Sequence, residues 1–404
     1  MADADAGEGR LRRNAIVMGA TWALMAPFNS AVGAYSSLYF MELGASPLEL
    51  GLIHSSYLLT LAVSRLLGGY LADRIGRRTL IIPMTAVYAT SNLLFAWAKG
   101  VSSLFVAAVV MGLALMYQPA IGAIVMDSVP KGRRGRTIAI LNTASEAASL
   151  MGPMLGGLAV RIWGLRQGVR ILYVGGFAAS SASALIRLML VETVPRKPLG
   201  GLRKFVTEYL SALSLFRGPY GKLVLVESLS LSAYGAVWTF AQVFAVKYAG
   251  MAPELWGLAN TLTGVVFLAS NILWGHLADR FSPARVISAS NLMGALEDLT
   301  LATGAPGREF SVLSYLAMSS LHTNYPAYFS MSASLIPPSH RAKLEALAGL
   351  LMEPASAAFS AVEGWVYGLS PRGTFVLASA LHALSAAMAF TLLPICVSGN
   401  RDPS

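Results

Sequence analysis

The stretch Gly69-Tyr70-Leu71-Ala72-Asp73-Arg74-Ile75-Gly76-Arg77-Arg78 recurs, slightly altered, as Gly275-His276-Leu277-Ala278-Asp279-Arg280-Phe281-Ser282-Pro283-Ala284-Arg285. Each copy is short and basic and lies between two long apolar runs, which is typical of a loop joining two transmembrane helices on the positively charged side of a bilayer. Residues downstream of the two copies match at a spacing that is one residue larger, for example Pro119 with Pro326 and Glu146 with Glu353. A chain of 404 residues that repeats at about half its length is predicted to contain two homologous halves.

The composition is that of an integral membrane protein. Hydrophobic residues make up 55% of the chain and charged residues 12%, and the mean hydropathy is +0.60. Twelve apolar runs are near or above the length of about twenty residues that spans the hydrocarbon. The expected helices cover 14–41, 48–70, 79–98, 102–128, 137–163, 168–191, 221–247, 254–276, 284–304, 309–335, 342–368 and 373–396. The sequence therefore predicts an all-α membrane protein.

The polar interval between the sixth and seventh runs divides the chain. It is rich in proline, glycine and basic residues, which break the apolar pattern. The predicted organisation is an N-terminal half (1–195), a linker (196–220) and a C-terminal half (221–404). Within the linker, residues 202–216 are amphipathic enough to lie along a membrane surface.

The net charge of +10 is distributed unevenly between the ends of the apolar runs. In the twelve-helix arrangement, 21 Lys and Arg residues fall on the side of the two termini and seven on the other, while Arg65 and Arg187 lie inside helices. This excess predicts that both termini are cytoplasmic. Membrane topology thus accounts for the charge, and no nucleic-acid partner is expected.

Chemistry that depends on a bound group is not indicated. The single cysteine, Cys396, has no partner for an internal disulfide, and the spacings typical of zinc ligands are absent from the sequence. There is also no phosphate-binding loop of the Gly-x-x-x-x-Gly-Lys-Ser/Thr type. We expect no metal and no cofactor, and any transport work is expected to draw on a gradient.

The first repeated stretch resembles the Gly-x-Leu-Ala-Asp-Arg-x-Gly-Arg-Arg signature between helices 2 and 3 of the major facilitator superfamily, and the second resembles its weaker echo between helices 8 and 9. Residues 152–157, Gly-Pro-Met-Leu-Gly-Gly, resemble the fifth-helix motif of that superfamily's drug/proton antiporters, although Ala148 stands where a further glycine is often found. The resemblance implies twelve transmembrane helices in two pseudo-symmetric six-helix halves (the MFS fold). It also implies a multi-pass protein of the cell membrane that works as a monomer, not an enzyme.

By the same resemblance, the first loop is a cytoplasmic latch. Asp73 would cap a helix of the opposite half, and Arg77 would pair with Asp127 at the end of helix 4. Without the resemblance, the same charges could simply be solvated and set topology. The second copy lacks the second glycine and is expected to be weaker. The predicted latch residues are Gly69, Asp73, Arg74, Gly76, Arg77, Arg78, Asp127, Gly275, Asp279 and Arg280.

Small residues and prolines inside the helices predict close packing and bends. Gly152, Pro153, Gly156 and Gly157 are clustered at spacings that let two helix backbones approach, although both residue types are also tolerated in membrane helices. In the family, this motif lies where helix 5 meets helix 8. Pro119 and Pro326 are predicted kink sites in helices 4 and 10.

Acidic residues at membrane depth are candidates for proton coupling, because a charge there costs several kcal/mol and must face a partner or a wet cavity. Glu146 lies roughly 14 Å into helix 5, Glu353 lies at the matching depth in helix 11, and Glu227 enters helix 7 less deeply. Glu363 and the pair Glu297-Asp298 fall nearer the outer face. The alternative for each acid is a structural bond between helices.

Polar and aromatic residues on helices 1, 4, 7 and 10 predict an amphipathic substrate cavity. Taken singly, each is as readily a packing residue. The candidates are Asn29, Tyr117, Gln118, Tyr234, Trp238, Gln242, His322, Asn324 and Tyr325. Tyr234, Trp238 and Gln242 recur every fourth residue and are expected to share one face.

These features favour a secondary transporter that moves a small organic solute by alternating access within the lipid bilayer. Proton-coupled efflux is the leading hypothesis, and uptake of a sugar or organic acid, by symport or facilitated diffusion, is the alternative. An ion channel would need pore rings that two halves of one chain do not obviously supply. A membrane enzyme would need a catalytic constellation that the sequence does not reveal.

Overall fold

The computed structural model describes residues 2–129, 134–196, 198, 213, 216, 218–304, 309–336 and 341–393. Within these residues the chain is almost entirely helical and contains no strand. Two compact units are formed: unit 1 comprises Met1–Gly44 and Leu59–Leu202, and unit 2 comprises Ala45–Leu58 and Arg203–Ser404. The predicted surface helix at 202–216 lies almost wholly outside the described residues.

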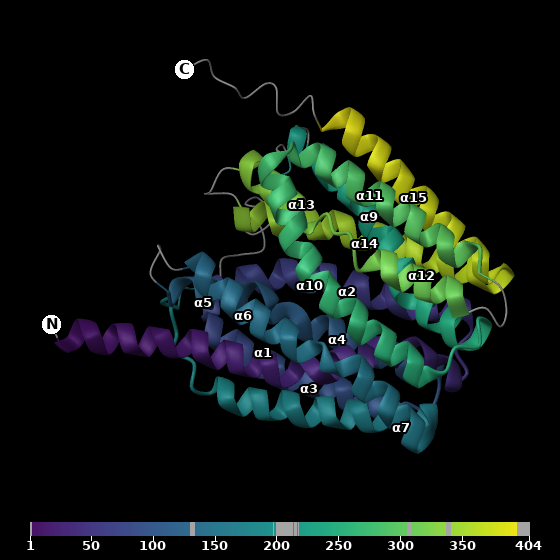
Figure 1. Cartoon of the computed structure of the whole chain (residues 1–404). Coiled ribbons are helices and arrows are strands. Elements are labelled where there is room, and N and C mark those ends of the chain that lie inside the picture. Colours follow the sequence, from purple (N-terminus) through teal and green to yellow (C-terminus); the bar gives the residue numbers. More distant parts are fainter. Residues whose placement is uncertain are drawn as a thin grey trace, which may run out of the picture. The chain divides into compact units, whose positions relative to one another are not determined.

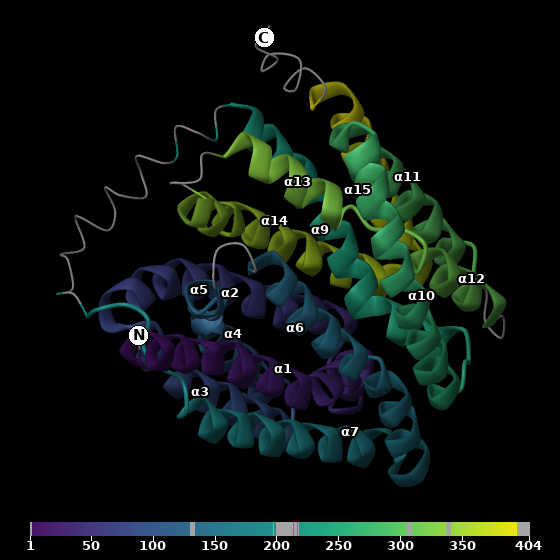
Figure 2. The ribbon, with the colours of Figure 1, turned by 60° about the vertical axis from the view of Figure 1, so that its left-hand side comes forward.

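Unit 1 contains five of the first six predicted spans in full, together with the later part of the second span. Its elements are α1 (Ala2–Glu42), the later part of α2 (Pro47–Ile75), α3 (Arg77–Ala96), α4 (Val101–Ala114), the 3₁₀ turn η1 (Leu115–Tyr117), α5 (Gln118–Asp127), α6 (Arg134–Ser149) and α7 (Met151–Arg187). Helix α7 packs along both α1 and α3 (Figures 1 and 2).

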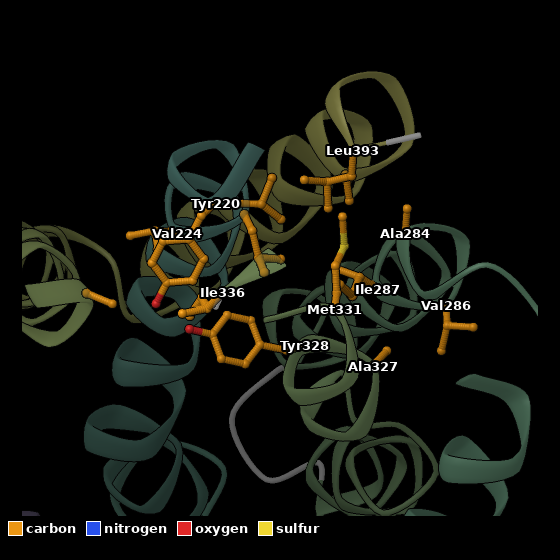
Figure 3. Packing of buried hydrophobic residues seen from close by; sticks show 14 of the residues in the cluster. Tyr220, Val224, Ala284, Val286, Ile287, Ala327, Tyr328, Met331, Ile336 and Leu393 are labelled. Atoms are coloured by element: carbon orange, nitrogen blue, oxygen red, sulfur yellow. The ribbon is translucent and has the colours of Figure 1, made fainter. Parts of the chain in front are cut away.

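Unit 2 contains the other six spans together with the first turns of α2. Its own elements are α9 (Pro219–Val243), the π-helical turn η4 (Phe244–Tyr248), α10 (Pro253–Arg280), α11 (Pro283–Ala302), α12 (Glu309–Ser319), α13 (Tyr325–Leu335), α14 (Arg341–Leu369) and α15 (Pro371–Leu392). Helix α15 packs along α11 and α9. The apolar core of unit 2 joins Tyr220 and Val224 of α9 to Ile287 of α11 and Met331 of α13 (Figure 3).

The helices are long enough to cross a membrane. Eight helical stretches of the described chain combine sufficient length with sufficient apolarity. One of them, Thr137–Arg187, is 51 residues long, which is about two spans, and its backbone turns at Gly164, where φ is 75° and ψ is 163°. With that stretch counted twice, and with α11, the pair α12–α13, and α14, the described residues form the twelve predicted helices.

Two spans are interrupted where proline was predicted to bend them. In the fourth span, α4 gives way to the η1 turn, which ends two residues before Pro119. In the tenth span, the chain leaves the helix over residues 320–324, just before Pro326. Because proline lacks an N–H and clashes with the carbonyl four residues earlier, both interruptions follow from the sequence. The predicted kinks are confirmed, although the second is a break of five residues.

The repeated stretches are more helical than predicted. Residues 69–75 form the last turns of α2, and residues 275–280 form the last turns of α10, so neither is a loop. The sequence Leu-Ala-Asp-Arg consists mainly of good helix formers, and these outweigh the turn signal of the flanking glycines. Helix α1 likewise begins at Ala2 instead of residue 14, over a segment rich in Ala and Arg.

The glycine motif of α7 packs closely, as predicted, and its partner is α1. A Cβ atom at Gly152 would lie 2.5 Å from the carbonyl oxygen of Pro27, and one at Gly156 would lie 2.6 Å from the ring of Tyr35. Pro153 and Gly157 are also buried. The predicted contact between helices 5 and 8 would join the two units and stays a prediction.

Candidate functional site

The N-terminus of α3 gathers the predicted latch residues of unit 1. The buried guanidinium of Arg77 forms an ion pair with Asp127 at the end of α5. Its Nη1 also donates to the carbonyl oxygen of Ala123 at 2.9 Å and to Oγ1 of Thr193 at 3.2 Å. Asp73, one helical turn before Arg77, lies 3.9 Å from the same guanidinium and is mostly exposed. The structure therefore brings together Asp73, Arg77 and Asp127.

A carboxylate that sequence reasoning missed completes this site. Glu192 follows α7, and its two carboxylate oxygens accept hydrogen bonds from the backbone N–H groups of Arg77 (2.9 Å) and Arg78 (3.1 Å). Those groups belong to the first turn of α3, where N–H groups lack partners within the helix and an anion is stabilised by the helix dipole. Glu192 thus ties the end of the sixth span to the start of the third.

The remaining basic residues of the stretch bind backbone carbonyls around this point. Arg74 Nη1 donates to the carbonyl oxygen of Pro198 at 3.2 Å, and its guanidinium lies over the ring of Tyr70 at 5.4 Å. Arg78 Nη2 donates to the carbonyl oxygen of Leu188 at 3.0 Å. The segment after α7 is therefore held by several residues of the repeated stretch.

The second copy differs in backbone and in chemistry. Gly76 has a φ of 101°, whereas Ser282 at the matching place has a φ of −60°. When Pro119 is aligned with Pro326, the residue matching Asp127 is Ser334, which carries no charge. Asp279 and Arg280 are exposed and have no ion pair among the described residues. The ion pair of the first stretch therefore has no counterpart in the second, in line with the expectation of a weaker copy.

A polar network surrounds the helix break of unit 2. From this break, Asn324 Nδ2 donates to Oε2 of Glu227 at 2.9 Å and to Oγ of Ser230 at 3.2 Å. Ser230 in turn donates to Oδ1 of Asn291 at 3.0 Å, and Asn291 Nδ2 donates to Oγ of Ser385 at 2.8 Å. The break therefore connects α9, α11 and α15 through side chains.

Two histidine–carboxylate pairs lie beside this network. His322, also in the break, pairs through Nε2 with Glu297 of α11, and its Nδ1 lies 3.3 Å from Oγ of Ser290. His382 of α15 pairs through Nδ1 with Asp298 at 2.8 Å. All four side chains are buried or nearly so.

The other acids of unit 2 are buried as well. Glu363 of α14 is fully buried, and within the described chain neither of its carboxylate oxygens has a hydrogen-bond partner. Glu353 of the same helix is buried beside Gly349. Glu146, its repeat-related counterpart on α6, is instead exposed on unit 1. The predicted proton-coupling roles of Glu146, Glu353 and Glu227 stay predictions.

The cavity candidates of unit 1 have polar partners. Asn29 Oδ1 accepts a hydrogen bond from the hydroxyl of Tyr88 at 3.0 Å, and Gln118 Oε1 accepts one from Nε of Arg65 at 2.8 Å. Tyr117 is buried beneath the guanidinium of Arg187, 5.3 Å from the ring centre.

The aromatic candidates of unit 2 are exposed. Tyr234 and Trp238 of α9 are 56% and 50% exposed, and their rings stack with centroids 6.2 Å apart. Tyr325 of α13 is exposed and stacks on Phe329 at 6.4 Å. Gln242 departs from the expected shared face: it is buried, and its Nε2 donates to the backbone oxygen of Trp238 at 3.2 Å. His322 and Asn324 belong to the network of the break.

No group of three or more His, Cys, Asp or Glu side chains in the described residues has an arrangement that could hold a metal ion.

Comparisons with known proteins agree with this architecture. The pattern of the Major Facilitator Superfamily matches residues 15–251 and 223–403. The chain is 25% identical to Multidrug resistance protein MdtG of Escherichia coli (strain K12 / DH10B) over 306 residues, which cover 70% of this chain and 71% of the relative. It is 22% identical over 284 residues to an uncharacterized MFS-type transporter of Methanocaldococcus jannaschii, covering 69% and 72% of the two chains.

Solved structures show the same fold at low identity. A bacterial homologue of the human lysosomal transporter Spinster matches with a TM-score of 0.78 and 15% identity, covering 98% of this chain and 99% of that one. A POT family transporter in complex with 5-aminolevulinic acid matches with a TM-score of 0.75 and 12% identity, covering 95% and 96%. Since the family pattern extends over both halves, this chain belongs to the Major Facilitator Superfamily and is a multi-pass membrane transporter of small solutes.

Proposed function

We propose that the protein is a proton-coupled exporter of amphipathic organic compounds that acts as a monomer in the cell membrane with both termini in the cytoplasm. The observation that carries proton coupling is the set of buried carboxylates in unit 2. Glu227, Glu297, Asp298 and Glu363 have no lysine or arginine partner among the described residues. A carboxyl group that is buried without a cation is favoured in its neutral, protonated form and ionises more readily when water reaches it. The charge of these acids therefore depends on their access to water.

The export of amphipathic compounds is supported by two further observations. The stacked pairs Tyr234–Trp238 and Tyr325–Phe329 present exposed aromatic surface on α9 and α13, which suits a partly apolar solute. In addition, several relatives at 24–25% identity are named multidrug resistance proteins.

Uptake of a sugar or organic acid remains the second candidate. The observation in its favour is Arg65 of the second span. Its guanidinium binds Gln118 and would provide a positive charge for a carboxylate of the solute. The buried acids of unit 2 favour the first candidate, because they would oppose an anionic solute.

Purified protein in liposomes under an imposed pH gradient tests the proposal. A panel of cationic drugs, sugars and carboxylates is offered, and movement of the compound and of protons is recorded. Transport of drugs with proton counterflow is the expected result. Sugar or carboxylate uptake without counterflow would replace the first candidate by the second.

Glutamine variants then test which acids participate. Glu146→Gln, Glu353→Gln and Glu227→Gln each mimic a protonated carboxyl group, and Glu254→Gln, in an exposed first turn of α10, is the matched control. A coupling acid is expected to lose gradient-driven transport while keeping exchange of the compound across the membrane. An acid whose variant behaves like Glu254→Gln is not part of coupling.

A further inference from the structure

Two buried histidine–carboxylate pairs of unit 2 are anchored on neighbouring residues of one helix. Glu297 and Asp298 are consecutive residues of α11, so they project from neighbouring positions of the same helix. His322 reaches Glu297 from the helix break, and His382 reaches Asp298 from α15. We call these four residues the imidazole–carboxylate cluster.

The surroundings of the cluster contain further acids and phenols but no cation. Glu363 of α14 lies within electrostatic range of Asp298. Tyr234 of α9 and Tyr315 of α12 lie within range of Glu297. No lysine or arginine pairs with these groups in the part of the chain that the structure describes.

The charge of this region is therefore set by the protons it holds. With both imidazoles neutral and all three carboxylates ionised, Glu297, Asp298 and Glu363 would place three negative charges in the interior. Such burial is strongly unfavourable when no cation compensates it. One proton on each histidine–carboxylate pair and one on Glu363 makes the region neutral. Hydration of the same groups stabilises the charged forms and permits release.

The cluster is attached to a part of unit 2 in which helical hydrogen bonding is incomplete. The N–H groups of Ser320 and Leu321 still donate to the carbonyl oxygens of Leu316 (3.2 Å) and Met318 (2.9 Å), and the helix resumes at Tyr325. His322 lies within the break at residues 320–324, and Asn324 of the same break binds Glu227. The indole Nε1 of Trp274 donates to the carbonyl oxygen of Leu321 at 2.8 Å, which satisfies a backbone group that the break leaves open. Movement of this segment would change the pairing of His322 with Glu297 and of Asn324 with Glu227 together.

We propose that the imidazole–carboxylate cluster, with Glu363, is a proton-binding site that exchanges protons as the break moves. The inference that these protons are the coupling protons rests on the proposed function. The ligand is the proton alone, because the cluster is too enclosed for an organic solute and has no arrangement suited to a metal ion. The site is distinct from Glu146, which is exposed on unit 1.

Infrared difference spectroscopy of the full chain in lipid tests this directly, with the proton as the probe. Spectra are compared between mildly acidic and mildly alkaline pH. In an interior without a compensating cation, the proton of each pair is expected on the carboxyl group, which leaves both partners neutral. We therefore expect a carboxylic-acid band that is lost on alkalinisation, and Glu297→Gln, Asp298→Asn and Glu363→Gln are each expected to remove the share of one carboxyl group. His322→Asn and His382→Asn should shift the pH at which the band is lost.

Matched controls use exposed residues of the same types. His276→Asn and Glu254→Gln, both exposed on α10, are expected to leave the band and its pH dependence unchanged. A single substitution in the cluster leaves a buried partner unpaired and can disturb folding. The combined variant His382→Asn with Asp298→Asn is therefore included, because it retains a neutral hydrogen-bonded pair of similar size. A pH-dependent band that is the same in the wild type and in all cluster variants would overturn the proposal, as would the absence of any such band in the wild type.

Transport separates this inference from the proposed function. If the cluster titrates but the wild type transports no compound under a pH gradient, proton-coupled transport fails and the proton-binding site stands. If the wild type is driven by the gradient and the cluster variants are driven equally well, the assignment of the coupling protons to this site fails.

Discussion

Substitution of Gly76 by alanine should destabilise the protein more than the same substitution at the other positive-φ glycines of the described chain. At those glycines a Cβ atom would meet no neighbour within 4 Å. Gly76 has a φ of 101° and a ψ of 144°, a combination that L-residues adopt only with strain. A Cβ atom there would also overlap a carboxylate oxygen of Glu192, which caps the first turn of α3. The substitution therefore has two separable effects, one on the backbone and one on the cap.

The magnitude of each effect can be worked out from the structure. Backbone strain at such a position costs about 1–3 kcal/mol. Displacement of Glu192 removes two hydrogen bonds from backbone N–H groups to a charged acceptor, and because Glu192 is partly exposed we assign about 1 kcal/mol to each. The expected loss in the free energy of unfolding is about 3–5 kcal/mol. Gly44→Ala is the matched control, because Gly44 has a φ of 95° but nothing lies within 4 Å of its Cβ position.

Equilibrium unfolding of purified protein in detergent, followed by tryptophan fluorescence, measures both variants. In the Glu192→Ala background, Gly76→Ala should cost only the strain, so a double-mutant cycle should give a coupling energy of about 2 kcal/mol. Equal costs for Gly76→Ala and Gly44→Ala, with no coupling to Glu192, would refute the reasoning and would leave backbone strain as the only role of this glycine.

Two further predictions concern transport and topology. Asp73→Asn and Arg77→Ala should each impair transport while the protein remains folded and in the membrane, because they remove charges beside the junction of α2 and α3. The matching substitution Asp279→Asn should do less harm. Equal loss of transport at Asp73 and Asp279 would contradict the asymmetry of the two copies. Single cysteines at Arg12, Lys131 and Lys204, whose side chains lie outside the described residues, should be protected from a membrane-impermeant reagent applied to intact cells; ready labelling at any of them would overturn the predicted orientation.

The sequence was sufficient for the architecture because the fold depends on patterns that are local. Apolar runs of spanning length predict the helices, and the internal repeat predicts the two halves. The bends at Pro119 and Pro326 follow from the covalent structure of proline. Helix ends were predicted less well: residues 69–75 were expected to form part of a loop but continue α2 in spite of the glycine at its start.

Site residues were predicted where a repeat, a family motif or a polar residue inside an apolar run drew attention to them, but most of their pairings were not. Arg77 pairs with Asp127 as expected, whereas the cap that Asp73 was expected to form on a helix of the opposite half stays a prediction. Nothing in the local sequence around Glu192 indicates that it returns to the start of α3. His382 was missed for the same reason, because its partner Asp298 is 84 residues away on another helix. Long-range pairs of this kind leave no periodic signal in a single sequence.

The two halves each interrupt a helix before the repeated proline but differ in the charge buried around the interruption. Each has a helix interruption just before the repeated proline, and Tyr117 in unit 1 corresponds in the repeat to Asn324 in unit 2. Tyr117 lies against Arg187, which is 1% exposed and binds the hydroxyls of Thr21 and Thr85 at 3.2 Å and 2.6 Å, with no acid partner among the described residues.

Around the second interruption the buried groups are acids and imidazoles instead. A guanidinium keeps its proton under all physiological conditions, whereas an imidazole–carboxylate pair exchanges its proton when its hydration changes. Two interruptions with the same origin in the sequence therefore have different chemical capacities. A fixed positive charge in unit 1 can stabilise helix packing but cannot carry a proton through a transport cycle. On the proposed function, the exchangeable protons of these two buried regions would belong to unit 2, even though the repeated stretch with the stronger set of contacts belongs to unit 1.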